Sequence, residues 1–189
     1  MTEEELIRGC MENSRVAQKQ LFNEYYAEML SLCKLYCVNH DDAESVVNHG
    51  FMDVFVNMGK FKNQSSLRTW IRRIMTNKSI DFYNKEKLKL SRQLSIDNER
   101  QIVINAEDFN ENILNKLQYQ DLQKLIHSLP DNERNVFVMF VIEGYSHKEI
   151  AESLNIVEGT CRWYMNNARK LLKEKLKKNE QFEQQKQQV

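Results

Sequence analysis

Glycine and proline are scarce in this sequence, which holds five glycines and one proline among 189 residues. Together these two residue types make up about 12% of an average protein. Tight turns, β-hairpins and glycine-rich phosphate-binding loops depend on them. Their scarcity therefore argues against a β-sandwich, a β-barrel or a glycine-lined phosphate site.

Long apolar runs are lacking as well. The longest unbroken run extends from Val136 to Ile142, whereas a membrane-spanning helix needs about 20 apolar residues. The first residues, Met1 to Glu5, are acidic, where a signal peptide would be basic and then apolar. These features predict a soluble, cytoplasmic protein that is not embedded in a membrane.

Cysteine is present only four times, which is too few for a disulfide framework in a chain of this length. Cys33 and Cys37 are four residues apart and would share the inner face of a helix. With His40 they could bind a metal ion, but structural zinc needs a fourth ligand and none is nearby. We predict buried thiols, with a thiol or metal sensor as the alternative.

Catalytic side chains do not cluster along the sequence. The four histidines are scattered, without a cysteine or aspartate partner at catalytic spacing: His40, His49, His127 and His147. We therefore predict that the protein is not an enzyme and uses no cofactor or metal.

Acidic and basic residues balance at 27 each, but their distribution is uneven. Residues 67–92 carry eight basic and two acidic side chains, and residues 160–178 carry seven and one. The intervening residues 93–133 are acidic. Compact basic blocks are typical of nucleic-acid contacts, although a solvated helix face can have the same composition.

Helical periodicity runs through most of the chain and predicts an all-α protein. Apolar residues recur at helical spacing within 14–38, where the stripe begins at Val16, and again within 41–58 and 67–89. The polar residues 93–112 lose this period, which indicates a linker between two small helical domains. The expected bounds are a first domain at 1–92, a linker at 93–112, a second domain at 113–178 and a disordered tail at 179–189.

Local capping signals indicate where several helices begin. Thr2 with Glu5, and Ser146 with Glu149, have the spacing of a capping box. Asp41 followed by Glu44 indicates another start, and Pro130 suits the first turn of a further helix.

Residues 144–173 have the pattern of a helix-turn-helix, in which a short helix and a tight turn lead into a longer helix. One face of the longer helix is apolar, and the opposite face is basic and carries asparagine. Arginine and asparagine can read guanine and adenine, while lysine neutralises phosphate. An ordinary helical hairpin with a basic outer face is the alternative. The buried face of the longer helix should consist of Cys161, Met165, Ala168 and Leu172.

The C-terminal half resembles a known family in the segments 129–137, 143–151, 158–160 and 168–172. These segments are similar to the promoter-reading domain of bacterial RNA polymerase sigma factors. The resemblance implies that the basic face of the helix-turn-helix contacts the −35 promoter element.

The N-terminal half resembles the same family. Asp42–Phe51 is similar to the helix by which sigma factors dock on the polymerase clamp. Trp70–Asp81 is similar to their helix for the −10 element, although Trp70 also fits the apolar stripe of a core. Size and layout resemble the extracytoplasmic-function (ECF) group, and the resemblance spans about residues 5–178.

The resemblance implies three sets of contact residues. Those for polymerase are Asp42, Glu44, Val47, Asn48, Phe51 and Val54. Those for −10 DNA are Phe61, Asn63, Gln64, Ser65, Arg68, Arg72, Arg73, Asn77 and Lys78. Those for −35 DNA are Thr160, Arg162, Trp163, Asn166, Arg169, Lys170 and Lys173.

Within these sets, the loop 61–66 stands where family members capture a base flipped out of the melted strand. Trp163 and Asn167 depart from the family, which commonly has serine and arginine there. The implied partners are core RNA polymerase, promoter DNA and an anti-sigma factor. A free-standing transcriptional regulator that binds duplex DNA without polymerase is the alternative.

Overall fold

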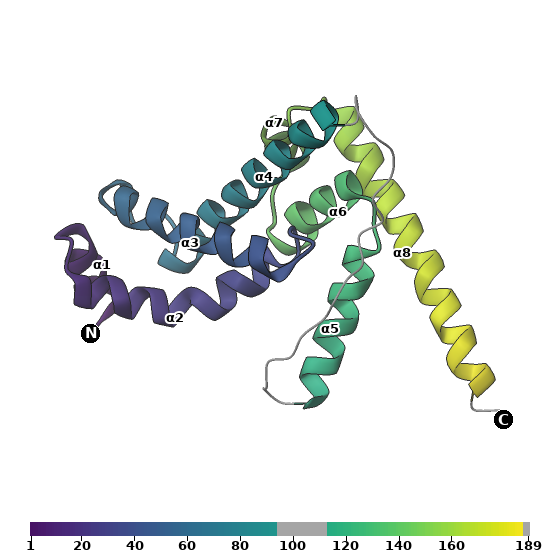
Figure 1. Ribbon diagram of the computed structural model, residues 1–189, viewed down its shortest axis with the longest axis horizontal. Helices are drawn as coiled ribbons and strands as arrows, with labels where there is room; N and C mark the ends of the chain where they lie inside the picture. Colours follow the sequence, from purple (N-terminus) through teal and green to yellow (C-terminus); the bar gives the residue numbers. More distant parts are fainter. Residues whose placement is uncertain (94–112, 187–189) are drawn as a thin grey trace. The chain divides into compact units, whose positions relative to one another are not determined.

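The computed structural model describes the backbone of residues 1–93 and 113–186 and the side chains of residues 1–89 and 120–177. Every regular element in these ranges is helical (Figure 1), which confirms the all-α prediction. The chain divides into two compact units, residues 1–105 and 106–189. Apart from its first residue, the predicted linker lies outside the described residues. No helix in the described ranges is long and apolar enough to cross a membrane.

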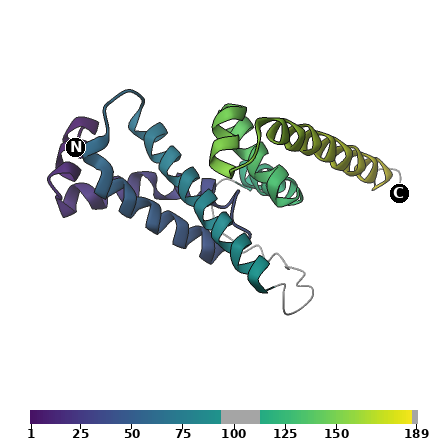
Figure 2. The same cartoon turned by 90° about the horizontal axis from the view of Figure 1, so that it is seen from above.

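The N-terminal unit is a bundle of α-helices (Figure 2). Helices α2, α3 and α4 pack on one another, and α1 packs on α2 and on a short 3-10 turn. The elements of the N-terminal unit are α1 (Glu3–Met11), α2 (Arg15–Cys33), α3 (His40–Asn57), the 3-10 turn η1 (Met58–Lys60) and α4 (Leu67–Gln93).

Side-chain caps fix two helix starts in this unit. Thr2 and Glu5 form the predicted capping box at α1. The predicted start of α3 at Asp41 is wrong, because the helix begins at His40 and Asn39 caps it. The Asn39 Oδ1 atom accepts a hydrogen bond from the Asp42 backbone N–H at 2.8 Å, and Asn39 Nδ2 donates to Asp42 Oδ2 at 2.7 Å. An asparagine can make both bonds at once, which an aspartate cannot.

The core of the N-terminal unit lies between α2, α3 and α4. Val16 does not join it, contrary to the prediction: this side chain is 72% exposed in the first turn of α2. The largest fully buried side chains of the unit are Leu21, Met29, Phe51, Met58, Leu67, Ile71 and Met75. Because one stripe of each helix enters this core, the opposite faces of α3 and α4 are left for solvent or partners.

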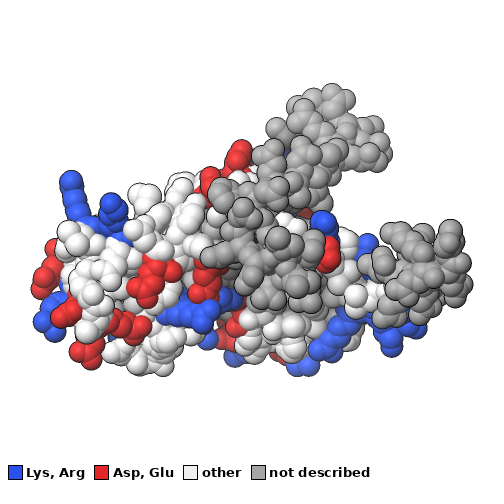
Figure 3. Space-filling model, turned by 90° about the horizontal axis from the view of Figure 1, so that it is seen from below, with Lys and Arg blue, Asp and Glu red and all other residues white. Residues whose placement is uncertain are grey.

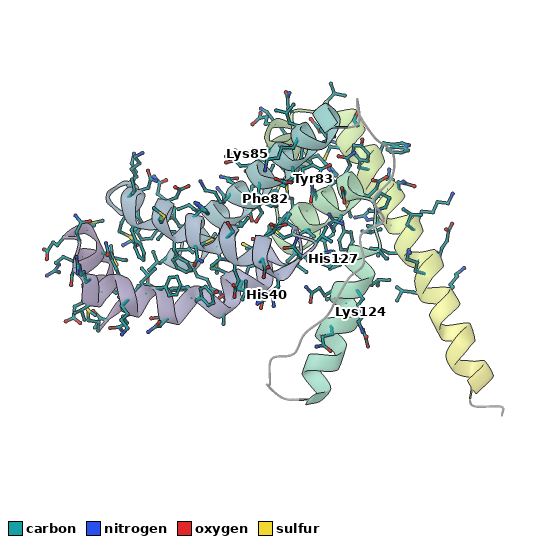
Figure 4. The ribbon with its side chains drawn as sticks, viewed as in Figure 1. His40, Phe82, Tyr83, Lys85, Lys124 and His127 are labelled. Atoms are coloured by element: carbon teal, nitrogen blue, oxygen red, sulfur yellow. The ribbon has the colours of Figure 1, made fainter. Side chains whose placement is uncertain are left out.

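The thiols of Cys33 and Cys37 are buried, as predicted. The Ser79 hydroxyl donates to Cys33 Sγ at 3.6 Å. His40 lies at the start of α3 (Figure 4), where its Nε2 atom is 3.3 Å from Glu44 Oε1. Within the described side chains, no three histidine, cysteine or acidic groups come together as metal ligands do.

The C-terminal unit is built around α8, on which α5, α6 and α7 pack. Helix α8 continues to Lys186, beyond residue 179 where the sequence predicted a disordered tail. Pro130 stands at the N-cap of α6 rather than inside its first turn. The elements are α5 (Ile113–His127), α6 (Asp131–Phe137), the π-helical turn η2 (Val138–Ile142), α7 (His147–Leu154) and α8 (Glu158–Lys186).

Helices α7 and α8 form the predicted helix-turn-helix. Ser146 and Glu149 make the capping box that starts α7, and Asn155 ends it in a left-handed conformation with φ of 53°. The predicted inner face of α8 is buried at all four positions: Cys161, Met165, Ala168 and Leu172. The basic side of α8 therefore faces away from the core of the unit.

Candidate polymerase and nucleic-acid interfaces

Helix α3 exposes only part of the set of residues implied by the family resemblance. Val47, Phe51 and Val54 are fully buried, and the rings of Phe51 and Phe22 lie 4.7 Å apart. These three side chains hold α3 in the bundle and cannot contact a partner directly. Asp42 and Glu44 are half-buried, and Asn48 is exposed.

The outward stripe of α3 contains two apolar residues that sequence analysis missed. Met52 is 63% exposed and Val56 is 82% exposed. Together with the exposed Ser45 and Asn48 they form one stripe, because Met52 lies four residues after Asn48 and Val56 lies four residues after Met52. This spacing could have identified them, but nothing local indicates which apolar stripe of the helix faces the core.

The loop before α4 divides into a buried and an exposed part. Phe61 is buried against Trp70, with their ring centroids 5.4 Å apart, so it is not presented to a DNA base. Asn63, Gln64 and Ser65 are exposed, and Asn63 has a left-handed φ of 57°.

Two arginines at the start of α4 share one carboxylate from α2. Arg68 Nε lies 2.9 Å from each carboxylate oxygen of Glu28, and Arg72 Nη1 lies 2.5 Å from Oε1. Further along α4, Lys78 Nζ forms an ion pair with Asp53 Oδ2 of α3 at 2.5 Å. Figure 3 accordingly shows acidic and basic side chains beside one another over the N-terminal unit.

A shallow groove of about 260 Å³ lies between α3 and α4. The Lys78–Asp53 ion pair lines it, together with Trp70 and Asn77. Trp70 is half-buried, so it is partly a core residue, as its apolar stripe predicts, and partly a wall of this groove. Arg73 and Asn77 are exposed on the same helix.

The second half of α4 carries an aromatic and basic surface. Phe82 and Tyr83 are half-buried, and Lys85 is exposed near them on this helix (Figure 4). The Lys87 Nζ atom lies 5.9 Å from the centre of the Tyr83 ring, within the range of a cation–π contact.

The outer face of α8 is strongly basic. Arg162, which pairs with Glu158 at 2.5 Å, is the only one of its four exposed arginines and lysines within 158–173 to form an ion pair. Thr160 is half-buried, and Asn166 is exposed. The exposed cations are Arg162, Arg169, Lys170 and Lys173.

Trp163 projects from the middle of this face with 59% of its surface exposed. Its ring meets the edge of Tyr164 at 5.2 Å between centroids, and Tyr164 Oη accepts a hydrogen bond from Asn132 of α6. Asn167 donates from Nδ2 to the buried Glu133 at 2.8 Å. Asn167 therefore ties α8 to α6, and Trp163 remains available to a partner.

The side chains of His147, at the start of α7, and Cys161, on the buried face of α8, contact each other, although no sequence pattern pairs them. Their Nδ1 and Sγ atoms lie 3.4 Å apart, and the imidazole stacks on Phe140. Burial, reinforced by Glu158, raises the pKa of the Cys161 thiol, and burial and Arg162 lower the pKa of His147. Both groups are thus held neutral, so this is a packing contact and not an activated nucleophile.

Comparison with known proteins places both units in one family. The profile of sigma-70 region 2 matches residues 21–88, and that of sigma-70 region 4 matches residues 119–172. The ECF RNA polymerase sigma factor SigW of Bacillus subtilis is 26% identical over 177 residues, which cover 90% of this chain and 95% of that protein.

Two further proteins agree over most of the chain. The ECF RNA polymerase sigma-E factor of Haemophilus influenzae is 22% identical, covering 93% of this chain and 96% of that protein. The fold resembles that of the sigma factor RpoE from Bartonella quintana, solved in complex with the anti-sigma factor NepR, with a TM-score of 0.55 and 21% identity over 84% of this chain and 96% of that one. The chain belongs to the ECF group of the sigma-70 family of RNA polymerase sigma factors.

Proposed function

We propose that this chain is a cytoplasmic, non-enzymatic initiation factor that binds core RNA polymerase and directs it to promoters with −10 and −35 elements. The observation that carries the proposal is that region 2 and region 4 match in the order typical of sigma factors. Each match contains a helix with a solvent-facing basic surface, α4 in one unit and α8 in the other.

Polymerase docking is assigned to the outward stripe of α3. Met52 and Val56 lie one helical turn apart and so form a small apolar patch with polar side chains beside it, a setting that is typical of protein-binding surfaces. Met52 and Val56 provide the apolar contacts, and Asn48 with the half-buried Asp42 and Glu44 provides polar ones. The buried Val47, Phe51 and Val54 keep this stripe facing outward.

The −10 DNA is assigned to the surface that runs from the loop before α4 along that helix. Asn63, Gln64 and Ser65 offer exposed amide and hydroxyl groups for the edge of a flipped base. Arg68, Arg72, Arg73, Asn77 and Lys78 follow along α4 and can hold the backbone of the opened strand. Phe61 supports this surface from below through Trp70.

The −35 duplex is assigned to the outer face of α8. Arg162, Asn166 and Arg169 have the side chains that read guanine and adenine in the major groove, while Lys170 and Lys173 neutralise phosphate. Thr160 and Trp163 complete the contact surface at the start of the helix.

An anti-sigma factor is the proposed regulatory partner. RpoE of Bartonella quintana was solved with such a protein, and its fold resembles that of this chain over most of its length. Two separate basic surfaces and one apolar docking stripe give a regulator several surfaces to cover.

The proposal can be tested by measuring core polymerase binding to the labelled full-length protein. The double substitution Met52→Glu and Val56→Glu places two carboxylates on the docking stripe. Because the stripe faces solvent, folding should persist, and binding should fall about 100-fold, as expected when central interface side chains are lost. Val16→Glu alters a similarly exposed valine on α2 and should leave the affinity unchanged.

Two other outcomes would contradict this assignment. Unchanged binding by the double variant would place the docking surface elsewhere. If the wild-type protein ignores core polymerase and binds promoter duplex unaided, the chain is a free-standing regulator instead.

A further inference from the structure

The Glu28 carboxylate occupies the space between two guanidinium groups at the start of α4. Both of its oxygens lie 2.9 Å from Arg68 Nε, and Oε1 also accepts from Arg72 Nη1 at 2.5 Å. Glu28 comes from α2, forty residues before Arg68. Two arginines around one oxyanion form the arrangement that proteins use to bind carboxylate and phosphate groups.

Two guanidinium groups contact this one carboxylate, and they differ in how far solvent reaches them. The Arg68 side chain is 62% exposed, whereas the Glu28 side chain is 27% exposed. An anion in solution can therefore reach Arg68 without any movement of the helices. An ion pair with one exposed partner, such as Arg68 with Glu28, is weak, so an oxyanion from solution can compete with the carboxylate there. The Arg72 side chain is 24% exposed, and its contact with Glu28 is more sheltered.

A carboxylate is an unfavourable neighbour for a DNA-binding surface. It repels phosphate and neutralises a cation that would otherwise release counterions on binding DNA. A second cation of α4, Lys78, is also paired with a carboxylate from another helix, Asp53 of α3. The start of α4 thus has the geometry of an oxyanion site that the protein itself fills.

We propose that Arg68 and Arg72 form a binding site for one backbone phosphate of single-stranded DNA, and that Glu28 occupies this site until DNA displaces it. The proposal rests on the assignment of α4 to the −10 DNA. Glu28 then acts as an internal competitor that weakens binding of the isolated protein to DNA. It also keeps the two arginines oriented before the phosphate arrives.

The test uses the full-length protein and a fluorescein-labelled, single-stranded DNA 12-mer of random sequence, with binding followed by anisotropy over a series of salt concentrations. Glu28→Gln should bind about two- to fivefold more tightly, the range expected when a weak ion pair no longer competes. The slope of log K against log salt should steepen by about 0.7, the value for one further phosphate neutralised on a single strand.

The control is Asp121→Asn, which also converts a carboxylate to an amide and gives the same gain of charge, on a helix that is not assigned to DNA. Asp121 of α5 pairs with Lys124 and not with an arginine of the proposed site. This control should leave both the affinity for DNA and the salt slope unchanged, whereas Glu28→Gln should change both. An equal effect of the two substitutions would mean that net charge alone acts, and it would overturn the proposal.

A double-mutant cycle identifies the groups that respond. With Arg68 and Arg72 both changed to Gln, the further change Glu28→Gln should have no effect on DNA binding. A persistent gain, or weaker binding by Glu28→Gln alone, would overturn the proposal and leave Glu28 as a structural tie between α2 and α4. If Glu28→Gln fails to fold, NMR of the wild-type protein replaces it, since the Arg68 Nε–H resonance should shift on adding the 12-mer.

The test of the phosphate site can fail while the proposed function holds. If Glu28→Gln changes neither DNA affinity nor salt slope in a protein that still binds core polymerase, only the phosphate site is rejected. Failure to bind core polymerase rejects the sigma assignment, whatever Glu28 does.

Discussion

The two helices assigned to DNA hold their cations in different ways. On α4, Arg68, Arg72 and Lys78 pair with carboxylates from α2 and α3. On α8, Arg162 pairs with Glu158 of its own helix, and no described carboxylate pairs with Arg169, Lys170 or Lys173.

Because of this difference, we expect the two units to contact DNA under different conditions. Cations that are already paired give a surface that is oriented but partly neutralised, and DNA must displace their partners. Unpaired lysines and arginines attract duplex DNA strongly at low salt and weakly at high salt. We therefore expect α8 to make the first, salt-sensitive contact and α4 to bind DNA when the strand has been opened.

The comparison of the two units assumes that each has its own core and unfolds independently. Phe51→Ala tests this independence and should have the largest effect of the proposed substitutions. Phe51 is fully buried in the N-terminal unit, and its removal should destabilise that unit by about 3–5 kcal/mol. Trp70 and Trp163 stand one in each unit, so Trp→Phe variants allow each to be followed by fluorescence during denaturation. A matching loss of stability at Trp163 would show that the units unfold as one.

Trp163→Ala should weaken binding to a −35 duplex by about 1–3 kcal/mol, the usual cost when recognition of one base pair is lost. An exposed indole amid cations is suited to the methyl group of thymine. Replacing each thymine of the duplex in turn by uracil, in wild type and variant, measures the contact. If every uracil costs the same in both proteins, Trp163 touches no thymine methyl group.

Lys170→Gln should weaken duplex binding to a similar extent for all sequences. The slope of log K against log salt should become shallower by about 0.9, because one phosphate contact is lost. Lys124→Gln removes an equally positive side chain from α5 and should leave the slope unchanged. Equal slopes for wild type and Lys170→Gln would remove Lys170 from the DNA contact.

A smaller effect is expected from His147. Burial and Arg162, with a lesser contribution from Arg169, lower its pKa in the folded unit below the ordinary 6.5, while Glu158 opposes them. The unfolded chain therefore binds the proton more readily, and the stability of the unit should fall as the pH drops below about 6.5. His147→Gln should flatten this part of the profile, measured by denaturation between pH 8 and pH 5. An unaltered profile would assign the loss to other groups.

Local signals in the sequence predicted the helices and several caps. The capping boxes at Thr2 and Ser146 depend on residues three apart, and the buried face of α8 follows from helical spacing alone. Asn39 was missed because Asp41 offers the same kind of cap two residues later.

Tertiary contacts account for what the sequence did not reveal. The helical spacing of Val47, Phe51 and Val54 predicts a core face, whereas the family resemblance assigns the same residues to polymerase. Only the packing against α2 and α4 shows that this face is buried and that Met52 and Val56 are exposed. The Glu28–Arg68 and His147–Cys161 contacts join residues far apart in the chain. No local pattern encodes such pairs, so the proposed phosphate site could not be predicted from sequence.

The decisive measurement is run-off transcription with purified core polymerase on a library of random promoters. If α4 and α8 read the two promoter elements, the transcripts will depend on this protein and share a two-part upstream motif, one part for α4 and one for α8. DNA binding without core polymerase, and without new transcripts, would contradict the sigma assignment.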